Sequence, residues 1–192
     1  MTTALPEAPA PAHHSFLERV IGALRLDAAI YDEIEHDESS LGQAAGVVAL
    51  AAVATAIGAA GRAGGGAVGA VFGSLLGWLI STAFIWVVGV YWMKHTSDYK
   101  ELLRTLGFAS APNVLAVLGG IPVLGGIATL AAGLWSLAAF VVAVRQALDV
   151  TTGRAVLVCV LAVLVNAACI LGLVLLVGGL FGGGGSPGAV GS

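Results

Sequence analysis

An acidic run near the N-terminus is the densest group of side chains that could do chemistry. Five of the seven residues from Asp32 to Glu38 are Asp or Glu, and His36 lies among them. Carboxylates and an imidazole this close together could bind a cation or a basic partner. The run lacks the glycine and the twelve-residue frame of a calcium-binding EF-hand loop. It is therefore more typical of a solvated acidic segment beside a membrane, and we predict neither a metal site nor a cofactor.

Charged residues at the edges of apolar stretches could also make contacts. Arg104 follows Asp98 and Glu101 at one such edge. At another edge Arg145 and Asp149 are four residues apart, the spacing at which side chains meet on one helix face. These groups could fix helix ends as a structural ion cluster or could hold a ligand. The candidate contact cluster consists of three of these residues, of Glu35 from the acidic run and of the tyrosine just before that run: Tyr31, Glu35, Arg104, Arg145 and Asp149.

No catalytic set accompanies these residues. Cys159 and Cys169 lie ten residues apart with no second cysteine pair, which indicates small buried side chains rather than a zinc site. Asn166 is the strongly polar residue of the last apolar stretch, and such a side chain more often bonds across helices than binds a substrate. No nucleophile is placed beside a base, so the sequence favours a protein that is not an enzyme.

The composition defines the setting in which these residues act. The residue types AVILMFWYC make up 58% of the 192 residues, 28 further residues are Gly, and 10% are charged. Soluble domains contain about 25% charged residues, so this chain could not cover a water-exposed surface. Eight Lys and Arg against eleven Asp and Glu give no basic excess for nucleic acid. The sequence therefore predicts an integral membrane protein and excludes a soluble domain, a disordered chain and a nucleic-acid binder.

The positions of the charges divide the chain into apolar stretches. A helix needs about 20 apolar residues to cross the hydrocarbon core. Three charge-free stretches fit one helix each, and the longest fits two, with Gly119-Gly120-Ile121-Pro122 as the turn between them. The predicted fold class is all-α, a polytopic membrane protein with five transmembrane helices after an N-terminal amphipathic helix. The predicted spans are residues 43–61, 67–93, 105–120, 122–144 and 155–181.

The third span is the shortest, and it contains Pro112 beside Asn113. Because proline removes a backbone donor, this span is expected to be kinked, tilted or re-entrant. Five full crossings place seven Lys and Arg on the side of the N-terminus and leave Arg62 alone on the other side. Positive residues favour the cytoplasmic side, which predicts a cytoplasmic N-terminus and an external C-terminus.

The two ends of the chain differ from the membrane domain between them, which is expected to cover residues 15–181. Residues 1–14 contain three prolines and are expected to form a disordered leader. Residues 182–192 are expected to form a flexible glycine-rich tail.

A cytoplasmic arm, residues 15–38, is expected between the leader and the first span. Ser15 and Glu18 have the spacing of a capping box, which predicts a helix beginning there. Leu17 belongs to an apolar face that continues at helical spacing to Tyr31, and Arg19 belongs to the polar face. We expect this amphipathic arm to dock on the protein's own helices or, alternatively, to lie on the membrane.

A register of small residues follows the second span. Gly65, Gly69, Gly73, Gly77 and Ser81 recur every four residues. Small side chains in one helix stripe let two backbones approach closely within a membrane. We therefore predict a packing stripe, whose partner is another helix of the chain or a second copy in a homo-oligomer.

Several segments together resemble the Yip1 domain family of five-span membrane proteins. The most specific are the run Arg104–Pro112 and the run Ala143–Asp149. Shorter similar pieces are Phe16-Leu17-Glu18-Arg19, Leu24-Arg25-Leu26-Asp27, Tyr31-Asp32-Glu33-Ile34-Glu35, Gln43-Ala44 and Trp135. The resemblance covers about residues 15 to 180, and the family's layout agrees with the topology expected from the charges.

The resemblance implies a role in membrane organisation or trafficking. Eukaryotic members lie in ER and Golgi membranes and bind prenylated Rab GTPases through the cytoplasmic arm. This chain lacks the Asp-Leu-Tyr-Gly-Pro element of that arm, since Leu26-Asp27 and Tyr31 match it only loosely. It is more similar to the prokaryotic branch, whose membrane would be the plasma membrane.

Two classes of function follow from these observations. The first is a non-enzymatic adaptor or organiser that contacts the lipid bilayer and a protein partner at its cytoplasmic face. The second is a small oligomeric transporter or channel with Asn113 or Asn166 facing the path. A membrane enzyme is disfavoured, because the sequence offers no catalytic set.

Overall fold

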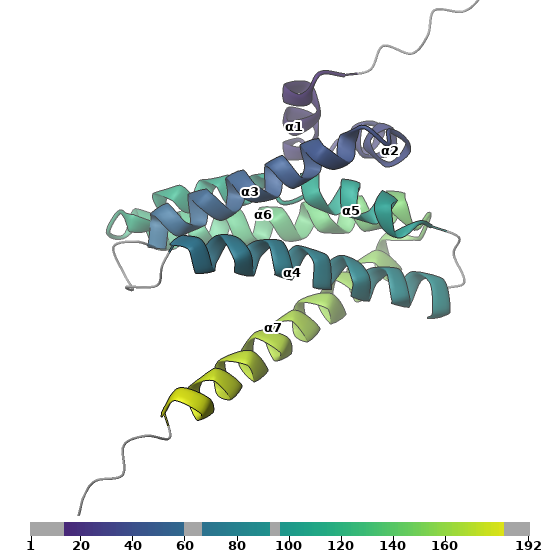
Figure 1. Cartoon of the computed structure of the whole chain (residues 1–192). Helices are drawn as coiled ribbons and strands as arrows, with labels where there is room; N and C mark the ends of the chain where they lie inside the picture. Colours follow the sequence, from purple (N-terminus) through teal and green to yellow (C-terminus); the bar gives the residue numbers. More distant parts are fainter. Residues whose placement is uncertain (1–13, 60–66, 93–96, 183–192) are drawn as a thin grey trace, which may run out of the picture.

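The protein is a bundle of helices, and the computed structural model in Figure 1 describes residues 14–59, 67–92 and 97–182. Within these ranges every regular element is a helix, which confirms the all-α fold class. The arm contributes α1 (Phe16–Leu24) and α2 (Ala28–His36). The elements that follow are α3 (Ser40–Ala59), α4 (Ala67–Val87), the π-helical turn η1 (Val88–Trp92), α5 (Tyr99–Phe108), the 3₁₀ helix η2 (Ala111–Gly120), α6 (Leu124–Ala147) and α7 (Thr152–Gly182).

Four helices of the described part are long and apolar enough to cross a membrane. Their apolar spans are Ser40–Ala59, Val71–Tyr91, Leu124–Ala147 and Thr152–Leu173. These spans match the first, second, fourth and fifth predicted ones. Their outward faces expose large apolar side chains, such as Leu130 on α6 and Leu164 on α7. A surface of this kind is suited to lipid rather than water, so these helices contact the bilayer.

The third predicted span is a bent pair of helices. The axes of α5 and η2 differ by 43°, and Pro112 lies in the first turn of η2, where its missing N–H breaks no helical bond. The pair runs beside α3. Near the start of α3, a Cβ added to Gly107 of α5 would lie 2.7 Å from the Cβ of Ala44. Near the end of α3, a Cβ added to Gly58 would overlap the carbonyl oxygen of Ala116 in η2. α5 and η2 therefore advance together with α3, and the described part of the chain has up to five spans if this bent pair is counted as one.

The arm docks on the protein's own helices, but its structure differs from the predicted single amphipathic helix. The chain turns between α1 and α2, where Leu26 has a φ of 60° and the carboxylate of Asp27 accepts a hydrogen bond from the Ala29 N–H at 3.0 Å. Two residues of α1 also lie on the opposite face from the one expected, since Leu17 is 65% exposed while Arg19 is 2% exposed. The expected placement of Arg19 on an outer polar face was therefore wrong, because its partners lie inside.

The core lies where the arm meets the bundle. Tyr31 and Ile34 of α2 are fully buried, and they belong to one apolar cluster with Leu102 and Leu106 of α5 and with residues of α6 and α7. Figure 1 shows α1 and α2 on one side of the bundle, beside α3, α5 and α6, with α4 and α7 on the other side. The arm is therefore part of the folded unit.

Polar contacts fix the arm along α6. The indole N–H of Trp135 donates to the carbonyl oxygen of Leu24 at 2.9 Å, at the end of α1. The side-chain amide of Gln146 donates to the carbonyl oxygen of Ala28 at 3.4 Å. These two donors satisfy backbone oxygens at the turn between α1 and α2.

Parts of five predictions lie outside the described residues. They are residues 1–13 of the predicted leader, residues 60–61 of the first predicted span, residue 93 of the second, residues 183–192 of the predicted tail, and Gly65 of the predicted packing stripe.

Candidate functional site

A buried arginine holds the arm together. Ser15 and Glu18 form the predicted capping box, which begins α1 and sets its register. One turn later the guanidinium of Arg19 donates from Nε and Nη2 to Oε1 of Glu33, at 3.0 and 2.8 Å. Nη2 also lies 2.5 Å from Oδ2 of Asp37. Two carboxylates of the acidic run therefore compensate one buried charge, which an apolar interior would otherwise strongly disfavour.

The electrostatics of these carboxylates follow from their contacts. Hydrogen bonds from Ser39 and then from Arg19 lower the pKa of Asp37 to about 2, against an opposing effect of burial. Burial alone would raise the pKa of Glu33, but hydrogen bonds from His14 and Arg19 hold it below its usual value. Both groups are ionised at neutral pH, so the pairs with Arg19 are intact there.

Arg104 of α5 joins the arm to the membrane-spanning bundle. Its Nε donates to the backbone carbonyl oxygen of Glu35 at 3.1 Å, and its Nη2 donates to the same oxygen. Arg104 is 5% exposed. The Glu35 carbonyl lies in the last turn of α2, where helix carbonyls lack partners within the helix and favour a positive charge. Arg104 therefore caps α2, while the nearby Asp98 and Glu101 form a capping box at the start of α5 instead of pairing with it.

The carboxyl group of Glu35 lies in an acidic environment. Burial is the main cause that raises its pKa to about 7, and the neighbouring charges of Glu101, Asp149 and Asp32 add to the effect while His36 opposes it. The structure thus brings Glu35, Arg104 and Asp149 of the candidate contact cluster to one region. Protonation of Glu35 near neutral pH makes this region sensitive to pH.

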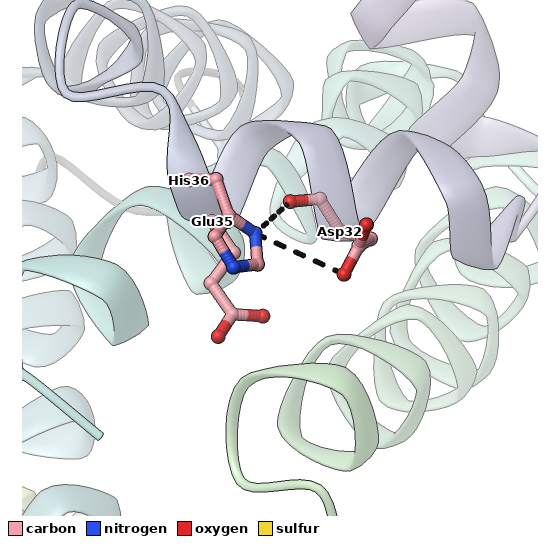
Figure 2. A group of neighbouring side chains, drawn as sticks. All are labelled: Asp32, Glu35 and His36. Carbon is pink, nitrogen blue, oxygen red and sulfur yellow. Dashed lines mark hydrogen bonds and ion pairs between the residues drawn. The ribbon is translucent and has the colours of Figure 1, made fainter. Parts of the chain in front are cut away.

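Figure 2 shows that Asp32, Glu35 and His36 form a group that could hold a metal ion, since one ligand atom from each lies within 4.8 Å of the others. The contacts among them have a simpler explanation. The Nδ1 atom of His36 lies 2.8 Å from the carbonyl oxygen of Asp32 and 3.8 Å from its carboxylate. These are ordinary contacts between residues four apart on one helix.

The other members of the candidate contact cluster lie apart from this region or inside the protein. Tyr31 is fully buried, and its hydroxyl donates to the carbonyl oxygen of Ala23 at 3.4 Å. Arg145 and Asp149, whose spacing would let them meet on one helix face, form no ion pair in the described part of the chain. The reason is that α6 ends at Ala147, and Asp149 beyond it has a φ of 46°, so the two side chains no longer share a helix face.

The packing stripe of α4 has an internal partner over half of its described length. The side-chain amide of Asn166 on α7 donates to the carbonyl oxygen of Gly77 at 3.4 Å and to the hydroxyl of Ser81. Gly69 and Gly73 face open space, since a Cβ added to either would have no described atom within 4 Å. The stripe therefore packs against α7 at one end, and at the other it makes no close contact with the described part of the chain.

Sequence reasoning missed the central role of Arg19. A helical pattern assigns charged residues to the outer face, and it carries no information on partners 14 and 18 positions away. The available signal was charge balance, since two arginines, Arg19 and Arg25, accompany an excess of acids in the arm.

Comparison with known proteins places this arrangement in a family. The family model of the Yip1 domain matches residues 28–177, which covers most of the chain and runs from the start of α2 into α7. Glu33, Glu35 and Arg104 lie within the match, and α1 with Arg19 precedes it. No curated protein and no solved structure gave a match. The match, the helical fold and the apolar spans agree, and the chain belongs to the Yip1 domain family of membrane proteins.

Proposed function

We propose that this protein is a non-enzymatic membrane organiser or adaptor whose contacts with a protein partner are made by the arm and the neighbouring loops. The observation that carries the proposal is that two buried arginines hold the arm in place, one within the arm and one from the bundle. Arg19 binds Glu33 and Asp37 within the arm, and Arg104 binds the end of α2 from the bundle. A surface held in this way is preorganised for binding, which lowers the entropic cost of association.

On the surface of the docked arm, exposed apolar side chains lie beside exposed acidic ones. Phe16, Leu17 and Ile21 of α1 are all more than a third exposed. Asp32 and Glu38 are exposed on the acidic run. Next to α1 a hollow of about 320 Å³ is lined by His14, Arg19 and Gln43 among others. Exposed apolar side chains surrounded by polar groups are typical of protein-binding surfaces.

The orientation belongs to the same proposal. With five crossings, the arm and the helix ends that carry Lys100 and Arg154 lie on the cytoplasmic side, and the C-terminus lies outside. The membrane is the plasma membrane of a prokaryotic cell, as the resemblance to the prokaryotic branch implies. Support comes from the distribution of Lys and Arg, of which seven of eight fall on one side.

Site-specific photocrosslinking in intact cells tests the partner-binding role. A photoreactive amino acid at Leu17 is expected to crosslink one defined partner, and the same amino acid at Val123 serves as the control. Val123 is 85% exposed and lies in the turn before α6, at the other end of the bundle. The crosslink should be lost when Arg104→Met releases the arm. Equal crosslinking from both positions, or none from Leu17, would contradict the proposal.

A small oligomeric transporter is the competing function, because Asn166 provides a polar group within a span. The full-length protein reconstituted in liposomes is expected to show no solute flux above that of protein-free liposomes. Reproducible flux that the substitution Asn166→Leu abolishes would replace the adaptor proposal with the transporter.

A further inference from the structure

A partly open, uncharged cavity lies between helices of the bundle, and no residue of the arm lines it. Its volume is about 440 Å³, within the range of roughly 300–1,000 Å³ that is typical of ligand pockets. The walls come from α4, η2, α6 and α7, and all lining residues are uncharged. Apolar side chains such as Phe140 and Ile170 make most of the wall. The polar lining residues are Ser81, Asn113, Ser136 and Asn166.

One hydroxyl in this wall lacks a hydrogen-bond partner. Ser136 is 6% exposed, and its Oγ is unpaired in the described part of the chain. Other hydroxyls in the apolar helices bond to the carbonyl oxygen four residues before them, as those of Thr55, Thr82, Ser110 and Thr129 do. A buried hydroxyl without a partner is destabilising. A ligand that bonds to Ser136 would remove this penalty once rotation of the side chain brings the Oγ, which is buried in its present position, to the cavity surface.

The two carboxamides beside Ser136 also have bonding capacity left. The Asn113 side chain makes no hydrogen bond to any described residue, and it lines the cavity from the start of η2. The amide nitrogen of Asn166 bonds to Gly77 and Ser81, which leaves its Oδ1 oxygen without a donor among the described residues. Uncharged carboxamide donors and acceptors are suited to orienting an uncharged polar group of a ligand.

A second, smaller cavity of about 220 Å³ adjoins the first. Ser81, Asn113 and Phe140 line both cavities, so the polar groups are continuous between them. Trp78 lines the smaller cavity, and its indole N–H is buried without a partner in the described ranges. Two residues that line these neighbouring cavities, Trp78 and Ser136, therefore each carry a buried polar atom without a described partner.

We propose that these cavities bind the uncharged polar end of a membrane lipid, of the diacylglycerol type. Its free hydroxyl and ester oxygens would bond to Ser136, Asn113 and Asn166. A phosphate or another charged headgroup would require a cation, and the lining holds none. The proposal is independent of the partner-binding role of the arm.

The position of the cavity indicates that the ligand comes from the bilayer. The lining residues of α6 lie between Gly133 and Phe140, in the middle of a helix that extends over Leu124–Ala147. A ligand from water would have to reach this depth, whereas a lipid is already there. The cavity is partly open, and Figure 1 shows α7 diverging from the rest of the bundle. Hydrocarbon chains can therefore leave between α6 and α7.

Photolabelling of the full-length protein in phosphatidylcholine nanodiscs tests the proposal. The probe is a diacylglycerol with a diazirine in one acyl chain, and labelled peptides are identified by mass spectrometry. We expect saturable labelling of peptides from α6 and α7. Unlabelled diacylglycerol should compete about tenfold better than phosphatidic acid, which carries the same chains and a charged phosphate.

A pair of glycine variants on α6 provides the matched control. Both Gly126 and Gly133 have no described atom within 4 Å of an added Cβ, but Gly133 lines the cavity and Gly126 does not. Labelling is expected to disappear in Gly133→Leu and to persist in Gly126→Leu. The variant Ser136→Ala should bind the probe about two- to tenfold more weakly, the effect of one lost hydrogen bond, while its thermal stability is unchanged or higher.

Four results would overturn the proposal. Labelling that does not saturate would mean that the cavities hold only water or that the probe reacts with the outer surface. Equal competition by phosphatidic acid would contradict the neutral chemistry. Undiminished labelling of Gly133→Leu would place the probe elsewhere. Disulfide crosslinking between two Gly133→Cys chains would show that a second copy fills the opening between α6 and α7.

Discussion

Arg104 and Glu35 show how single residues fix the arm to the bundle. The guanidinium bonds to a backbone carbonyl at the end of α2, not to the carboxylate of the same residue. The contact therefore depends on the charge and geometry of Arg104 and is independent of the ionisation of Glu35. Substitutions at these two positions should consequently have separable effects.

Substitution of Arg104 should release α2 from α5. In Arg104→Met the Glu35 carbonyl loses a charged donor, and we expect the free energy of unfolding to fall by about 2 kcal/mol. Hydrogen exchange measured by mass spectrometry should become faster in α2. Lys100→Met is the control, because Lys100 is exposed on the same helix. Unchanged exchange in α2 of Arg104→Met would show that the arm is held by other contacts.

Glu35 predicts a pH dependence of stability. Burial and neighbouring carboxylates raise its folded pKa to about 7 from its ordinary value of 4.5, so the folded state binds this proton more tightly than the unfolded state. Its contribution to stability is therefore present below pH 4.5 and lost as pH rises through 7. We expect Glu35→Gln to be about 1–3 kcal/mol more stable than the wild type at about pH 8 and similar to it at about pH 5.

Chemical unfolding of both proteins in detergent, at steps from about pH 5 to about pH 8, measures this difference. The comparison between variants is needed because His14 and His36 also have raised pKa values and lose their own contributions as pH rises. A constant difference between wild type and Glu35→Gln across the range would refute the assignment to Glu35.

At the scale of elements, close packing against α3 fixes the position of the bent pair that replaces the third predicted span. A Cβ on Gly58 would overlap the carbonyl oxygen of Ala116, which is backbone and has little freedom to move. Gly46 on the same helix has open space around it. The two glycines thus permit a matched test of whether η2 lies against α3.

The substitution Gly58→Ala should lower the free energy of unfolding by about 2–4 kcal/mol, as overpacking against a backbone atom requires a shift of η2. Gly46→Ala should be neutral or stabilising by up to about 1 kcal/mol, because alanine favours helix. Steric trapping or denaturant titration in micelles provides the values. Equal effects of the two substitutions would argue against close contact between α3 and η2.

The elements themselves were predictable to different degrees. Long apolar stretches determine where helices can cross, so the four long spans were predicted to within a few residues. Pro112 indicated that the third span is irregular, and α5 and η2 meet there at 43°. The Arg145–Asp149 pair was not predictable, because it depended on the end of α6, and that helix ends at Ala147, before Asp149. The face of α1 was not predictable either, because the partners of Arg19 lie on α2 and after it.

At the scale of the whole molecule, contacts between distant segments decide the candidate site. Arg104 meets Glu35 across 69 residues, and Asn166 meets Ser81 across 85 residues. Nothing in one sequence specifies such pairs, since each could be satisfied by other charged or polar groups. The composition and the charge distribution nevertheless indicated the class of protein, because they report on the solvent around the chain and do not depend on the packing.

In the proposed topology the chain crosses the membrane five times, with the arm and the C-terminus on opposite sides. Single cysteines are introduced by Ser39→Cys, Val123→Cys and Ser186→Cys into a Cys159→Ala/Cys169→Ala background and are reacted with a membrane-impermeant maleimide in intact cells. We predict labelling from outside at positions 123 and 186 and protection at position 39 until the cells are permeabilised. Protection of positions 123 and 186 together would mean that α5 and η2 form a re-entrant loop, and the five-span topology would be wrong.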